Sequence, residues 1–87
     1  MRELDASGLA CPLPVLKLRK ALATMEPGEL IALITTDAMS VVDLPVFCAQ
    51  AGHRILLEEK IVRQNNALRD NKTVDAFRFV IARGAES

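Results

Sequence analysis

Residues 7–14 read Ser7-Gly8-Leu9-Ala10-Cys11-Pro12-Leu13-Pro14, and they join a predicted strand to a predicted helix. Proline lacks a backbone N–H and suits the first helical turn, where N–H groups have no partner within the helix. The residue before a proline is pushed to extended geometry, which is also the geometry of an N-cap. Two helix starts satisfy this pattern: Cys11 as the N-cap with Pro12 first, or Leu13 as the N-cap with Pro14 first.

Cys11 is the candidate reactive residue of this stretch. In either register its sulfur is expected at or beside the helix N-terminus, where a partial positive charge favours the thiolate. A lone cysteine more often serves as a small buried apolar residue. A turn punctuated by glycine and proline is usually at the surface, which fits that alternative less well. Residue chemistry alone leaves both interpretations open.

The sequence around Cys11 resembles a known family signature. The pattern Leu4-Asp5-Ala6-x-Gly8-Leu9-x-Cys11-Pro12-x-Pro14 is similar to that of the TusA/SirA-like sulfur-carrier proteins. The similar order continues with Met25-x-Pro27-Gly28-Glu29, Asp37, Asp43-Leu44-Pro45-x-Phe47-Cys48 and Gly52-His53. The chain departs from the pattern at Leu13, where some members carry an acidic residue, and in a longer loop around residues 62–73.

The resemblance implies a role for each motif residue. Cys11 would carry a sulfane sulfur as a persulfide, with Gly8, Pro12 and Pro14 supporting the motif. The partners implied are a sulfur donor, such as a cysteine desulfurase or a rhodanese-type protein, and a sulfur-acceptor protein. No prosthetic group is implied.

Hydrophobic periodicity predicts six elements in the order βαβαββ. Strands are expected over residues 2–6, 30–34, 54–61 and 74–83, with an exposed hairpin loop over 62–71 and a frayed tail from Gly84. The first helix runs from the cysteine turn to Met25 and is ended by Pro27-Gly28. Asp37 caps a turn, Asp43 caps a helical start at Leu44, and Gly52 follows that helix. The two starts indicate one helix with an irregular beginning or a turn followed by a helix.

These elements predict a two-layer α/β sandwich, with two helices on one face of a four-stranded mixed sheet. The family resemblance implies the same fold, similar to the C-terminal domain of translation initiation factor three. Residues 1–87 are long enough for one domain, and the scarcity of aromatic residues predicts an aliphatic core. We expect Leu4 and Ala6 to share the buried face of the first strand, and Ile55 and Leu57 to share one face of the third.

Composition limits the binding partners and the cellular location expected for the protein. Eleven acidic residues balance eleven basic ones, so there is no general attraction to nucleic acid or to an anionic membrane. Arg2, Glu3 and Asp5 interrupt any apolar run at the start, and no apolar run approaches the ~20 residues of a membrane span. Two cysteines are too few for a disulfide scaffold. We expect a cytoplasmic monomer in a reducing compartment.

Several other residues have competing interpretations. Cys48 lies on an apolar helix stripe and is predicted to pack in the core. His53 follows a helix and is expected to be a solvated helix cap. A metal site would need Cys11, Cys48 and His53 to converge, and their spacing is not that of zinc ligands, so none is predicted.

The first helix carries a candidate basic patch of Lys17, Arg19 and Lys20. It is either an ordinary solvated face or a docking surface for an acidic partner, and Lys17 would also favour the Cys11 thiolate. A different class of function is a non-catalytic RNA-binding or regulatory module, with Arg63, Arg69 and Lys72 touching phosphates. The absence of Tyr and Trp for base stacking argues against RNA binding.

Overall fold

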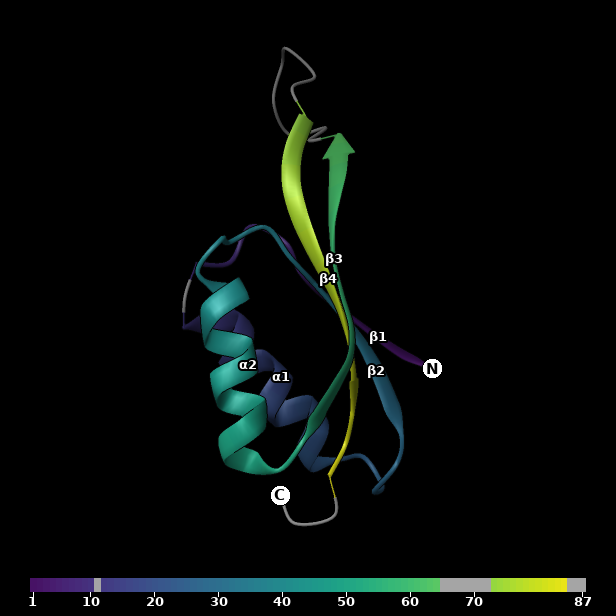
Figure 1. Ribbon diagram of the computed structural model, residues 1–87. Helices are drawn as coiled ribbons and strands as arrows, with labels where there is room; N and C mark the ends of the chain where they lie inside the picture. The colour runs from purple at the N-terminus through teal and green to yellow at the C-terminus, as the bar shows by residue number, and fades with distance from the viewer. Residues whose placement is uncertain (11, 65–72, 85–87) are drawn as a thin grey trace.

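A computed structural model of the protein describes residues 1–10, 12–64 and 73–84, and it shows a two-layer sandwich. The elements are β1 (Arg2–Ala6), α1 (Leu13–Ala23), β2 (Leu30–Thr35), α2 (Ser40–Ala51), β3 (Arg54–Gln64) and β4 (Thr73–Ala82). Both helices lie on one side of the sheet (Figure 1), so the predicted architecture and element order are confirmed.

The four strands form one mixed sheet in the order β1-β2-β4-β3. β1 and β2 are parallel, and the other two pairs are antiparallel. The parallel pair requires a crossover, which α1 supplies across the buried face. β2 therefore lies inside the sheet, which explains why its sequence is an almost continuous apolar run.

The core lies between the helices and the sheet and is aliphatic, as the composition predicts. Leu18, Leu22 and Met25 form the buried stripe of the first helical region, at 0, 2 and 4 % exposure. Ala6 is fully buried and Leu4 half-buried, so the predicted inward face of β1 is confirmed. The helix itself ends earlier than predicted, because the Thr24 N–H turns back to the Ala21 carbonyl at 3.1 Å.

The start of α2 differs from the predicted cap at Asp43. Asp37 Oδ1 accepts the Met39 N–H at 3.0 Å, and the helix begins at Ser40 with Asp43 inside its first turn. The first turns are tight, because Val42 N–H also donates to the Met39 carbonyl, at 3.1 Å. Of the two alternatives, one helix with an irregular beginning is confirmed. Gly52 ends it with a positive φ of 82°, as predicted.

β3 differs from the prediction in two respects, the facing of its side chains and its length. Its pairing partner changes from Ile81 at Ile55 to Val80 at Leu57, so Leu56 is an extra residue in a β-bulge. Ile55 and Leu57 therefore face opposite sides of the sheet and not the same side.

The strand also continues to Gln64, so the hairpin loop is shorter than the predicted span of 62–71. Pairing with β4 accounts for this extension, because Val62 lies opposite Asp75. Arg69 and Lys72 lie outside the described residues, as does the side chain of Arg63.

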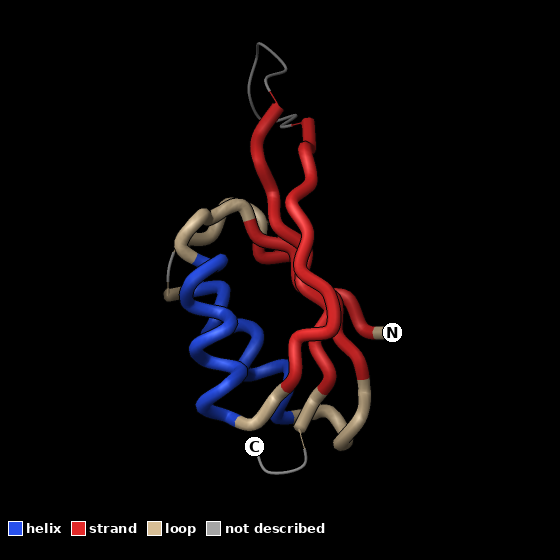
Figure 2. The backbone as a smooth tube through the Cα atoms, in the orientation of Figure 1, coloured by secondary structure: helices blue, strands red, loops and turns tan. Residues whose placement is uncertain are grey.

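The β3–β4 hairpin is longer than the rest of the sheet. β4 pairs with β2 only over residues 77–82, whereas it pairs with β3 over 73–82. The outer part of the hairpin is therefore a two-stranded ribbon that projects past the helices (Figure 2).

Candidate functional site

The turn after β1 is held by backbone geometry and by a threonine from the neighbouring strand. Leu9 N–H donates to the Ala6 carbonyl at 3.2 Å, which closes a β-turn with Gly8 at its third position. Gly8 has a φ of 80°, a conformation that a type II turn requires there and that glycine adopts without a steric penalty. Its N–H donates to Thr36 Oγ1 at 2.9 Å. Thr36 ties this turn to the end of β2, a role that no local sequence pattern indicates, because the two residues are far apart in the chain.

The turn lies at the carboxyl edge of the two parallel strands. Ala6 at the end of β1 is opposite Thr35 at the end of β2, so the chain leaves both strands on the same side. Thr35 is buried there, and its hydroxyl lies 3.0 Å from that of Ser40. This edge is where the sheet of an α/β protein characteristically presents its functional loops.

The observed start of α1 falls between the two predicted registers. Pro12 is the N-cap and Leu13 the first helical residue, and no side chain caps the helix. Leu13 N–H donates to the Ala10 carbonyl at 2.9 Å, and prolines 12 and 14 have no N–H. Of the backbone positions 12–15, three therefore have no free N–H that could donate to an anion. This limits how strongly the N-terminus of α1 can stabilise a negative charge.

Cys11 itself lies outside the described residues, between Ala10 and Pro12, which are both exposed. Pro14 differs from Pro12 because it is buried beneath the start of α1. The first motif proline thus lies at the surface next to position 11, while the second anchors the helix to the core.

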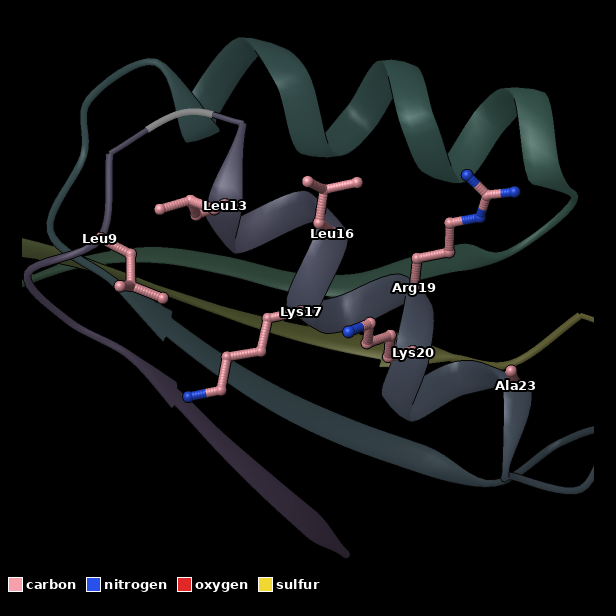
Figure 3. A pocket seen from close by; sticks show the side chains of 7 residues that line it. All are labelled: Leu9, Leu13, Leu16, Lys17, Arg19, Lys20 and Ala23. Carbon is pink, nitrogen blue, oxygen red and sulfur yellow. The ribbon is translucent and has the colours of Figure 1, made fainter.

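A groove of about 600 Å³ runs along the outer side of α1, directly after the cysteine turn (Figure 3). Its apolar part is unusual for a solvent-facing helix surface, since Leu13 and Leu16 are 48 and 45 % exposed. The residues that line it are Leu9, Leu13, Leu16, Lys17, Arg19, Lys20 and Ala23.

The three basic residues line this groove but do not gather into one patch. Lys17 Nζ donates to the Asp5 backbone carbonyl at 2.8 Å, so it reaches toward β1. Arg19 extends on the other side of α1 (Figure 3) and lines a second cavity of about 250 Å³ with Phe47 and His53. Within the described part of the chain, Arg19 and Lys20 make no ion pair. The groove therefore has an apolar floor and separate positive charges along its margins.

Cys48 lies in the core, as predicted. Its side chain is 2 % exposed and belongs to the cluster that α2 packs against α1 and the sheet. Burial raises the pKa of the Cys48 thiol from 9.0 to about 11, because the thiolate would lose its hydration. The thiol is therefore protonated and shielded at neutral pH.

His53 contradicts the prediction of a solvated cap. It is 8 % exposed and its ring lies 5.8 Å from that of Phe47. Its Nδ1 accepts the Gly84 N–H at 2.9 Å, which places the proton of the neutral ring on Nε2. Burial, followed by the charge of Arg83, lowers the pKa of His53 below 6.5.

Gly84, two residues after the end of β4, is also more closely packed than predicted. Gly84 was expected to begin a frayed tail, but a Cβ there would overlap the Gly52 carbonyl oxygen, so the two backbones are in close contact. Arg83 adds to this junction, since its Nε donates to the Leu22 carbonyl at 2.9 Å. The end of the sheet is thus tied to the ends of both helices, and a side-chain acceptor for Gly84 could not be identified from sequence.

Acidification is expected to destabilise the protein through His53. A group with a lowered pKa in the folded state contributes stability above its unfolded pKa, here about 6.5, and this contribution is lost as the pH falls. Urea unfolding should therefore give a smaller unfolding free energy at pH 5 than at pH 7. His53→Asn retains an acceptor near Nδ1 but does not titrate, so its loss over this range should be smaller. An equal loss in both proteins would contradict the assignment.

Among residues 1–10, 12–64 and 73–84, no group of three His, Cys, Asp or Glu side chains is arranged to hold a metal ion. None of the helices found there has the length and apolar character needed to cross a membrane.

Comparison with known proteins identifies the family of this chain. The family model described as sulfurtransferase TusA matches residues 2–83. The chain belongs to the TusA family. The match includes the cysteine turn, both helices and all four strands.

Curated relatives match the chain over shorter stretches. A protein named sulfur carrier protein TusA, from Allochromatium vinosum, is 46% identical over 55 residues, which are 63% of this chain and 72% of that protein. A putative sulfur carrier protein of Neisseria meningitidis serogroup A is 45% identical over 53 residues, 61% of this chain and 72% of its own.

A solved structure supports the fold of this TusA-family chain. The crystal structure of a SirA-like protein from Desulfitobacterium hafniense has a TM-score of 0.63 and covers 97% of this chain and 99% of its own. At 22% identity, this likeness concerns the fold.

Proposed function

We propose that the protein is a sulfur carrier in which Cys11 accepts a sulfane sulfur as a persulfide and relays it to an acceptor protein. The burial of Cys48 carries this proposal. The sequence has two cysteines, and Cys48 is 2 % exposed with a pKa of about 11. The family match and the names of the relatives support sulfur chemistry, and Cys11 is the thiol that remains for it.

The proposed transfer consists of two thiol-exchange steps. The Cys11 thiolate attacks the terminal sulfur of a donor persulfide, the S–S bond of the donor breaks, and the donor thiolate leaves. The product is Cys11–S–SH. A thiolate of the acceptor then attacks this terminal sulfur and Cys11 leaves as thiolate, so no external oxidant or reductant is needed.

We infer that the groove along α1 receives the partner during transfer. It starts beside the cysteine turn, its floor is apolar, and Arg19 and Lys20 are exposed at its margins. A partner with an apolar protrusion flanked by carboxylates would fit this surface. The partners would be a donor such as a cysteine desulfurase or a rhodanese-type protein, and an acceptor protein, and the monomeric form of the protein would meet both in the cytoplasm.

Charge reversal tests the docking surface. The double variant Arg19→Glu/Lys20→Glu is expected to load sulfur roughly tenfold more slowly than the unaltered protein, mainly through slower association with an acidic partner. The reaction of Cys11 with a small alkylating reagent should be unchanged. Arg54→Glu is the matched control, since Arg54 lies opposite Ala82 on the sheet face away from the helices. Equal loading by all three proteins would exclude the groove.

Intact-mass measurement tests the proposed carrier function. The protein is incubated with a cysteine desulfurase and cysteine, separated, and measured with and without a thiol reductant. We expect one adduct of about 32 Da that the reductant removes and that maps to the peptide containing Cys11. The proposal would be refuted by an adduct located on Cys48. It would also be refuted if neither a cysteine desulfurase nor a rhodanese-type donor gave an adduct.

A further inference from the structure

β3 is an edge strand whose outer side is open. It pairs with β4 on one side only, and its 11 residues make it the longest strand of the sheet. Three of its apolar side chains are well exposed: Leu56 at 51 %, Leu57 at 42 % and Val62 at 65 %. Long edges with exposed apolar residues readily pair with a further strand.

The sequence of β3 is complementary to itself when read antiparallel about Glu59. In that register Glu58 lies opposite Lys60 of a second copy, and Lys60 lies opposite Glu58. Outside these charges, Leu57 lies opposite Ile61 and Leu56 opposite Val62, again twice by symmetry. Within residues 56–62, each apolar residue thus meets an apolar residue, and Glu58 and Lys60 each meet a residue of opposite charge.

Neighbouring registers do not share this match. Centring the pair on Glu58 places Leu57 opposite Glu59 and Leu56 opposite Lys60. Centring it on Lys60 places Glu59 opposite Ile61 and Glu58 opposite Val62. Both alternatives bring charged groups against apolar side chains, which cross-strand pairing disfavours.

The structure agrees with the self-complementary register. Beyond the bulge, the pairing of Leu57 with Val80 and of Ile61 with Ala76 places both side chains on the sheet face opposite the helices. They would therefore meet on one face of a continuous sheet. Glu58 has no ion-pair partner in the described part of the chain, whereas Lys60 contacts Asp75 at 3.2 Å.

We propose that β3 pairs antiparallel with β3 of a second copy, about a two-fold axis at Glu59, to form a continuous eight-stranded sheet. The two Glu59 carboxylates are the one unfavourable contact at the centre. Arg78 of each chain lies 3.5 Å from its own Glu59 and offsets part of that repulsion. The Leu56 bulge bounds the regular pairing at each end.

The dimer is expected to be weak and reversible. Seven paired residues bury less than the ~800 Å² per partner of a stable complex, so we expect a dissociation constant on the order of 10–100 µM. α1 contacts β1, at the other edge of the sheet, while α2 contacts β3. The groove along α1 therefore stays open in the dimer, and this inference does not depend on the proposed sulfur-carrier function.

Sedimentation equilibrium of the full chain, with a thiol reductant present to prevent disulfide linkage, measures the association. From about 1 µM to about 1 mM, the weight-average mass should rise from 9.5 kDa toward twice that value. Glu58→Lys should raise the dissociation constant about tenfold, because two attractive pairs become repulsive. The double variant Glu58→Lys/Lys60→Glu restores opposite charges in this register and should recover most of the association.

Two further variants sharpen the test. Glu59→Gln removes the central repulsion and should tighten the dimer about threefold. Glu3→Lys makes the same charge reversal on β1, the opposite edge strand, and should leave association unchanged. Circular dichroism checks that each variant is folded. A protein that remains a 9.5 kDa monomer at 1 mM, or a dimer that the double variant does not restore, would overturn the proposal.

Discussion

In the Cys11→Ser variant, incubation with a cysteine desulfurase and cysteine is expected to leave the mass of the protein unchanged. The unaltered protein should gain about 32 Da under the same conditions. A serine hydroxyl is not ionised near neutral pH and does not attack a persulfide sulfur, so the substitution removes the proposed acceptor with the change of one atom. The effect is therefore a complete loss of loading, measured by intact-mass spectrometry.

The matched control is Cys48→Ala. It should retain the full adduct, because Cys48 is buried and its pKa is about 11, which leaves about one thiolate in a thousand thiols at pH 8. It should lower the unfolding free energy by about 1–2 kcal/mol through lost packing. Loading that persists in Cys11→Ser and disappears in Cys48→Ala, with both proteins folded, would reverse the assignment of the two thiols.

Phe79→Ala is expected to lower the unfolding free energy by about 3–5 kcal/mol, the largest stability effect predicted for this protein. Phe79 is fully buried on β4 and lies opposite Leu33 of β2. A domain of 87 residues buries a limited core, so its total stability is expected near the lower end of 5–15 kcal/mol. The variant should therefore melt about 15–30 °C lower, as followed by circular dichroism.

Phe77→Ala is the matched control on the same strand and the same face. Phe77 is only partly buried against the core cluster, so its truncation leaves a smaller cavity. We expect a loss of about 1–2 kcal/mol in urea unfolding. If the two variants lost the same unfolding free energy, the stability contributions of Phe77 and Phe79 would not follow their burial, and the prediction would be wrong.

The element order could be predicted because it depends on local patterns. Alternation in residues 2–6 and the apolar run beginning at Leu30 predicted the first two strands, and both were found. The helical stripe of Leu18, Leu22 and Met25 was likewise sufficient to predict the buried face of the first helical region. Glycine after the second helix predicted its end, because glycine adopts the positive φ that ends a helix without a steric penalty, and Gly52 has such a φ.

Boundaries were less predictable because partners distant in sequence determine them. Asp37 and Ser40 start α2 early through contacts that include Thr35, so Asp43 falls inside the helix. The β-bulge at Leu56 depends on the register between β3 and β4, which no local pattern specifies.

The sequence by itself determined the composition of the core, the order of the elements and the motif around Cys11, because periodicity and turn chemistry depend on residues close together in the chain. Only the tertiary structure decided that His53 is buried and neutral. Its acceptor role depends on Gly84, 31 residues away, which approaches the Gly52 backbone too closely for any side chain. Tertiary contacts also place the side chains of Lys17 and Arg19 on different sides of α1. Lys17 donates to the Asp5 carbonyl, whereas Arg19 lines the second cavity, because residues close together in a helix sequence can point toward different neighbours.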